Sequence, residues 1–225
     1  MNPRRRLVLE GIVLAAGLAC GLSVAAPRPP TQAELTTFFR AVQLDDAKTV
    51  GEMIGSVVNA NQVNPIGGEP GLVQALREDA MNVVKVFLDH PGTRLETKAA
   101  NGNTALMMAA FKRNRPAVEL LLAKGAKVNQ PGWTALHYAA ASGADDIVRL
   151  LLARGARVDA VSPPKSGGYT PMMMAAREGH DGTALVLIAH GADRARKNIE
   201  GLDAVQIAER AGKTRVAAAL QRGGR

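Results

Sequence analysis

The sequence predicts an all-α fold, a solenoid of about six stacked helix-turn-helix repeats. The first observation is an alanine that recurs at intervals of 30 to 36 residues. The second is that an apolar residue stands three places before each alanine and another twelve places after it. The third is that apolar residues within a block recur every three or four positions, which is helical spacing. The recurring alanines are Ala41, Ala75, Ala109, Ala139, Ala175 and Ala208.

Each block is predicted to contain two short helices. The alanine lies in the first helix, where a small side chain lets neighbouring helices approach closely. The second helix is leucine-rich, as in the stretch 118–122. Gly125, Gly155 and Gly191 follow second helices, and a glycine can end a helix by adopting a positive φ. The predicted repeats span residues 34–66, 67–99, 100–130, 131–164, 165–197 and 198–225.

Three blocks share a seven-residue motif. It reads Thr-Ala-Leu-Met-Met-Ala-Ala from Thr104, Thr-Ala-Leu-His-Tyr-Ala-Ala from Thr134 and Thr-Pro-Met-Met-Met-Ala-Ala from Thr170. This resembles the ankyrin repeat, whose motif centres on Thr-Pro-Leu-His-x-Ala. The resemblance implies an ankyrin-type solenoid, in which β-turn or hairpin fingers connect the repeats.

The motif histidine is present in one block, at His137. Met107, Met173 and Gln206 occupy the matching places in other blocks. The resemblance implies a structural role for this histidine, so we expect its hydrogen bonding only at His137.

The sequence contains no pattern typical of a catalytic or metal-binding site. Its four histidines form no two-histidine zinc motif and accompany no plausible nucleophile. The pair Gly167–Gly168 lacks the lysine and hydroxyl residue of a phosphate-binding loop. We therefore expect no enzymatic activity, no cofactor and no metal.

Residues 1–25 have the three parts of a secretory signal peptide. Arg4–Arg6 are basic, Ile12–Val24 form an apolar run, and Ser23–Ala25 are small residues suited to cleavage. Residues 26–33 are then expected to form a proline-rich lead-in, and residues 34–225 the repeat domain. This organisation predicts an exported bacterial protein located in the periplasm.

The one cysteine of the chain, Cys20, lies inside the predicted signal peptide. Cleavage after Ala25 would leave a cysteine-free protein, which suits an oxidising compartment. The alternative is a lipoprotein anchored at Cys20, because Gly17-Leu-Ala-Cys20 resembles a lipoprotein cleavage box. We expect membrane contact only through the signal peptide or through lipidation at Cys20.

Positive charge gathers toward the C-terminal end of a chain whose formal net charge is +8. Such a cluster could bind nucleic acid, anionic lipid headgroups or an acidic protein, or it could be a solvated face of the capping repeat. Export and the lack of interleaved aromatic residues argue against nucleic acid, so we expect none as a partner. The basic residues are Arg194, Arg196, Lys197, Arg210, Lys213, Arg215, Arg222 and Arg225.

The resemblance implies that a partner binds to the fingers and to the exposed face of the first helices. Phe111, Trp133 and Tyr169 fall on these positions, and aromatic residues are enriched at binding hot spots. Trp133 and Tyr169 hold the same place in adjacent fingers, so we expect them to project side by side next to a notch left by unequal finger lengths. The predicted partner-binding residues are Asn101, Asn103, Phe111, Lys112, Trp133, Tyr138, Tyr169 and Arg177.

We therefore predict a monomeric, non-enzymatic module that binds another protein in the periplasm as a scaffold or accessory factor. The resemblance also implies an alternative, because exported bacterial ankyrin proteins look like accessory factors and some are implied in peroxide or other stress defence. Two further alternatives are a small-ligand-binding protein and an enzyme whose site the sequence does not reveal.

Overall fold

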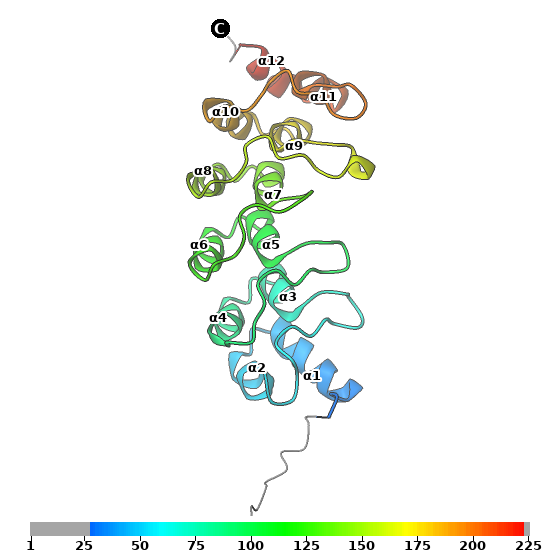
Figure 1. Ribbon diagram of the computed structural model, residues 1–225, viewed down its shortest axis with the longest axis vertical. Helices are drawn as coiled ribbons and strands as arrows, with labels where there is room; N and C mark the ends of the chain where they lie inside the picture. Colours follow the sequence, from blue (N-terminus) through cyan, green and yellow to red (C-terminus); the bar gives the residue numbers. More distant parts are fainter. Residues whose placement is uncertain (1–27, 223–225) are drawn as a thin grey trace, which may run out of the picture.

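The helices of this protein stack in two parallel rows, as the computed structural model shows for residues 28–222 (Figure 1). Within these residues there are twelve α-helices, two per predicted repeat, so the predicted all-α solenoid of six repeats is confirmed. The first row contains α1 (Gln32–Gln43), α3 (Gly71–Arg77), α5 (Ala105–Phe111), α7 (Ala135–Ser142), α9 (Pro171–Glu178) and α11 (Ala204–Arg210). The second contains α2 (Ala47–Met53), α4 (Met81–Asp89), α6 (Arg115–Ala123), α8 (Asp145–Ala153), α10 (Asp181–Ala189) and α12 (Thr214–Arg222).

The recurring alanines lie where neighbouring first helices meet. Ala109, Ala139 and Ala175 are fully buried, and α7 packs against both α5 and α9. A larger side chain at these places would separate the helices, because a close-packed interior has little spare volume. Each repeat thus buries its apolar face against its neighbours, as expected of a solenoid.

The two rows are held together by the apolar residues of the second helices. Leu121, Leu151 and Leu187 are each fully buried. Burying a leucine side chain contributes about 1.5–3 kcal/mol relative to leaving it exposed. The predicted helix ends are also confirmed, since Gly125, Gly155 and Gly191 follow α6, α8 and α10 with φ of 90°, 82° and 87°.

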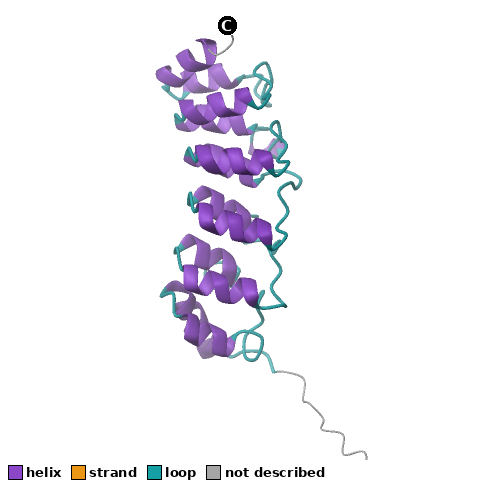
Figure 2. Ribbon diagram, turned by 90° about the vertical axis from the view of Figure 1, so that its left-hand side faces the viewer, coloured by secondary structure: helices purple, strands orange, loops and turns teal. Residues whose placement is uncertain are grey.

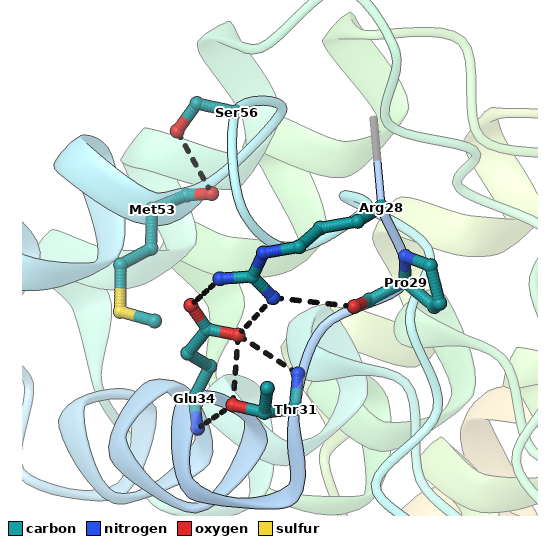
Figure 3. Close-up of polar contacts among 6 residues, drawn as sticks. All are labelled: Arg28, Pro29, Thr31, Glu34, Met53 and Ser56. Carbon is teal, nitrogen blue, oxygen red and sulfur yellow. Dashed lines mark hydrogen bonds and ion pairs between the residues drawn. The ribbon is translucent and has the colours of Figure 1, made fainter. Parts of the chain in front are cut away.

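The first helix is fixed at its N-terminus by a polar cluster (Figure 3). Thr31 caps α1, and its N–H and hydroxyl donate to Oε2 of Glu34 at 2.8 Å each. The Arg28 guanidinium donates to both oxygens of the same carboxylate, and these hydrogen bonds are the main reason why the pKa of Glu34 is lowered to about 2. Helix α1 therefore begins at Gln32, inside the segment 26–33 that the sequence predicts as a proline-rich lead-in.

The motif threonines cap the first helices, and the residue three places later completes each cap. The N–H of Thr134 donates to Nδ1 of His137 at 3.2 Å. The N–H groups of Thr104 and Thr170 donate instead to the sulfur atoms of Met107 and Met173, at 3.4 Å each. The expectation that this hydrogen bonding survives only at His137 is therefore wrong for the cap, because a methionine sulfur also accepts.

The fingers are turns that project along one side of the stack, where the loops lie in Figure 2. In the finger before α5, Ala99 donates to the carbonyl of Asn103 at 2.9 Å. The finger before α11 repeats this bond from Asn198 to Leu202, also at 2.9 Å. The β-turn fingers are thus present, whereas the described part of the chain contains isolated β-bridges and no hairpin strands.

The finger before α9 differs from the others by containing a short 3-10 helix, η1 (Pro164–Ser166). It lies beside a short finger before α7, which ends at Trp133 (Figure 1). The predicted signal peptide, together with Cys20, lies outside the described residues. Among the helices of residues 28–222, none combines the length and apolar character needed to cross a membrane.

Candidate functional site

An aromatic cleft opens on the first-helix face of the third, fourth and fifth repeats, with a volume of about 400 Å³. We use the name aromatic cleft for the hollow lined by Phe111, Trp133, His137, Tyr138, Ala141, Met174, Arg177 and Glu178. The cleft exists because a small residue stands between two large ones. Phe111, Ala141 and Arg177 each lie seven places after a motif threonine, so they share one register position in successive repeats.

Three aromatic rings line this cleft and pack edge to face. The ring of Tyr138 lies 6.1 Å from that of Phe111 and 6.1 Å from that of Trp133, with interplanar angles of 88° and 61°. Phe111 is 51% exposed, whereas Trp133 and Tyr138 are half-buried. Aromatic pairs of this geometry are stabilising beyond the area that they bury. The rings therefore form a preorganised apolar surface that remains partly open to solvent.

Tyr138 is held in place from the finger below it. Its hydroxyl donates to Oδ1 of Asn103 at 2.5 Å, and the N–H of Asn103 donates to Oδ1 of Asn101 at 3.1 Å. Burial raises the pKa of the Tyr138 phenol, so the phenol stays neutral and remains a donor. Asn101 and Asn103, two of the predicted binding residues, thus orient Tyr138 in this structure.

His137 closes the inner wall of the cleft and joins two repeats. It is fully buried, and its ring packs edge to face against Trp133 with 5.2 Å between centroids. Because Nδ1 accepts from Thr134, Nε2 carries the proton and donates to the carbonyl oxygen of Tyr169 at 3.0 Å. Burial lowers the pKa of His137 to about 4, so the ring is neutral at neutral pH.

Tyr169 is buried instead of projecting beside Trp133. It is 8% exposed, and the Arg177 guanidinium covers its ring at 5.2 Å from the centroid. The backbone of Gly167 closes over the ring, since a Cβ atom built there would lie 2.2 Å from Cε2 of Tyr169. The long finger before α9 folds back in this way, so Tyr169 supports the cleft through Arg177 and does not line it.

The structure therefore brings together four of the predicted binding residues, namely Phe111, Trp133, Tyr138 and Arg177. Lys112 is exposed but does not line the cleft. Met174 was missed by sequence reasoning, although it stands four places after its motif threonine, as Tyr138 does. That shared register position could have identified it.

A second hollow, of about 600 Å³, lies among the fingers of the fourth, fifth and sixth repeats. We call it the finger notch, and it opens where the short finger before α7 meets the longer finger before α9. The lining residues are Pro131, Gly132, Val161, Ser162, Pro163, Pro164, Gly168, Arg196, Lys197, Asn198 and Ile199. Neither hollow presents the clustered ligands of a metal site, and no such cluster of histidine, cysteine and acidic residues occurs within residues 28–222.

A stack of paired helices with turn fingers defines a repeat protein with an extended surface on its first-helix side. The family described as ankyrin repeats (3 copies) matches residues 38–131, 72–162 and 127–198. The chain belongs to this family, whose repeats are protein–protein interaction modules.

Two human proteins are among those similar to this chain. SH3 and multiple ankyrin repeat domains protein 2 is 30% identical over 181 residues, which is 79% of this chain and 10% of the relative. Transient receptor potential cation channel subfamily A member 1 is 40% identical over 65 residues, which is 28% of this chain and 6% of the relative. The chain thus matches a tenth or less of the length of these relatives.

Proposed function

We propose that this protein is a non-enzymatic module that binds a partner protein through the aromatic cleft. The observation that carries the proposal is the set of three edge-to-face rings in an open cleft of about 400 Å³. Tryptophan and tyrosine are enriched among residues that dominate interface energetics. Phe111 in particular exposes half of its side chain to solvent, although the surrounding cleft could bury it against a partner.

The lining of the cleft favours an apolar side chain of the partner. The aromatic rings and Met174 supply an apolar floor, and methionine adapts its shape to what it contacts. Arg177 and Glu178 stand at the rim and form an ion pair with each other at 2.9 Å. Because their charges are paired, the rim supplies orientation and hydrogen bonding rather than net charge.

The test uses a partner isolated by affinity capture from periplasmic extract and then purified. Trp133 is the only tryptophan of the chain, so incorporation of 5-fluorotryptophan places one fluorine in the protein, inside the cleft. Partner binding should shift the single fluorine NMR signal. Phe111→Ala should weaken binding by about 2 kcal/mol, or about thirtyfold in affinity.

Leu185→Ala is the matched control, since Leu185 is 40% exposed but lies on α10, in the other row of helices. This variant should bind as the parent does. An unchanged fluorine signal, or equal affinities for Phe111→Ala and the parent, would show that the partner binds outside the aromatic cleft.

We further propose export to the bacterial periplasm after cleavage near Ala25. The first described contact, from Arg28 to Glu34, lies beyond that point, so a chain cut there keeps its helix cap. The mass of the protein purified from cells tests this proposal. An intact Met1 would contradict export with cleavage, and a lipid mass on Cys20 would replace it with the lipoprotein alternative.

A further inference from the structure

The finger notch combines an apolar floor with a cationic rim. Val161 and Ile199 in its lining are 39% and 63% exposed, and Pro163 stands between the fingers beside them. Arg196 and Lys197 line the same hollow and are both exposed. The residues that line the notch include no acidic side chain. An apolar surface next to positive charge therefore remains without a complement within the described chain.

The basic residues of the loop 190–203, which joins α10 to α11, have different roles. The Arg194 guanidinium donates to the carbonyl oxygen of Leu220, so it holds α12 to the loop between α10 and α11. Arg196 and Lys197 form no ion pair with the acidic side chains of residues 28–222. The nearby Glu200 is engaged by Arg210. The positive charge of Arg196 and Lys197 is thus exposed and free of ion pairs within residues 28–222.

The walls of the notch are built by close contacts between fingers. Gly132 and Gly168 both have positive φ, and a Cβ atom at either place would approach Pro163 or Ile199 within 3.1 Å. The N–H of Ile199 also donates to the carbonyl of Gly167 at 3.2 Å. These contacts fix the floor of the notch, so a ligand would bind to a surface that already exists in the free protein.

Asn198 adds a further polar group to this wall. It is 6% exposed and its Oδ1 accepts from the N–H groups of Glu200 and Leu202. Its Nδ2 is the only buried side-chain nitrogen without a hydrogen-bond partner in the described part of the chain. The nitrogen itself is buried, so Asn198 supports the turn after Lys197 and is not open to a ligand in this structure.

We propose that the finger notch binds an acidic, extended peptide segment of a partner protein, with an apolar side chain on its floor. Carboxylates of the segment would meet Arg196 and Lys197, and an aliphatic residue or proline would pack on Val161, Pro163 and Ile199. A nucleic acid is a poorer fit, because single strands stack bases on aromatic rings and none lines the notch. The proposal does not rest on the aromatic cleft, which has a different lining.

The experiment selects binders from a displayed library of random decapeptides, using the purified protein. Selected peptides should be enriched in aspartate and glutamate around an apolar residue. Arg196→Gln with Lys197→Gln should weaken a selected peptide at least tenfold in fluorescence anisotropy and reduce the salt dependence of its affinity. Ile199→Ser should weaken it about tenfold while leaving the salt dependence unchanged.

Two controls separate the notch from general charge and from the aromatic cleft. Arg149→Gln with Lys85→Gln removes two positive charges from exposed places on α8 and α4. Neither residue forms an ion pair within residues 28–222, so this variant should leave binding unchanged. Phe111→Ala should also leave it unchanged.

Three results would overturn the proposal. The first is a selected set without acidic enrichment. The second is equal weakening by the notch and control charge variants. The third is displacement of the labelled peptide by oligo-dT or by phosphatidylglycerol vesicles at a lower concentration than the unlabelled peptide needs. That result would reassign the notch to a nucleic acid or a lipid surface.

Discussion

The buried histidine His137 makes the stability of the stack depend on pH, and His137→Met should remove that dependence. Met107 and Met173 show that a methionine at this place still accepts the cap N–H group. What methionine cannot supply is the hydrogen bond from Nε2 to the carbonyl of Tyr169. That carbonyl keeps the N–H of Ser162 as a donor at 2.9 Å, so it is not left unpaired. The substitution should therefore cost about 1 kcal/mol at neutral pH.

The sign of the pH effect follows from the direction of the pKa shift. Burial holds the pKa of His137 at about 4 in the folded protein, against an ordinary value of 6.5. Between these values the unfolded chain binds more protons than the folded one, so the free energy of unfolding falls as pH falls. The loss is about 1.4 kcal/mol per pH unit, or about 3 kcal/mol in all. Below pH 4 this residue adds no further loss.

The two effects oppose each other, so the stability curves of the two proteins should cross. The parent is more stable at pH 7.5, the curves should meet at about pH 6, and His137→Met should be the more stable protein at pH 4 by about 2 kcal/mol. Urea unfolding followed by circular dichroism at half-unit pH steps gives both curves. Carboxylates titrate in both proteins, so the difference between the curves isolates His137. Parallel curves from pH 7.5 to 4 would refute the reasoning.

Three other substitutions test the packing of the stack and the turns between its helices. Ala139→Leu adds volume between α7 and its neighbours and should destabilise by about 1–3 kcal/mol, whereas an unchanged denaturation midpoint would mean that the site tolerates a larger side chain. Arg113→Gly should stabilise by about 0.5–1 kcal/mol, because Arg113 has a φ of 57°, a conformation that is unfavourable for residues other than glycine. Gly143→Ala at the equivalent turn should destabilise by about 1–3 kcal/mol, because its Cβ atom would lie 2.5 Å from Nδ1 of His180. Urea melts measure both turn variants, and effects of the same sign would contradict the argument.

The sequence by itself determined the repeat architecture. The alanine register and the helical spacing of apolar residues are local patterns, and a solenoid uses contacts only between neighbouring repeats. A local pattern repeated six times therefore specifies the whole stack. The same register, read through the resemblance to ankyrin repeats, predicted Phe111 and Arg177 on the exposed face of the first helices and Trp133 in a finger, because equivalent positions in successive repeats face the same side.

The tertiary structure decided how those side chains are used. Tyr169 shares the register position of Trp133, yet it is buried because the longer finger before α9 folds back and Gly167 covers its ring. Likewise Arg194 is engaged by α12, while Arg196 and Lys197 of the same loop face the finger notch. Neither outcome could be predicted from the repeat pattern. Finger conformation depends on loop length and on contacts with the adjacent finger, and these lie outside the periodic signal that identifies the helices.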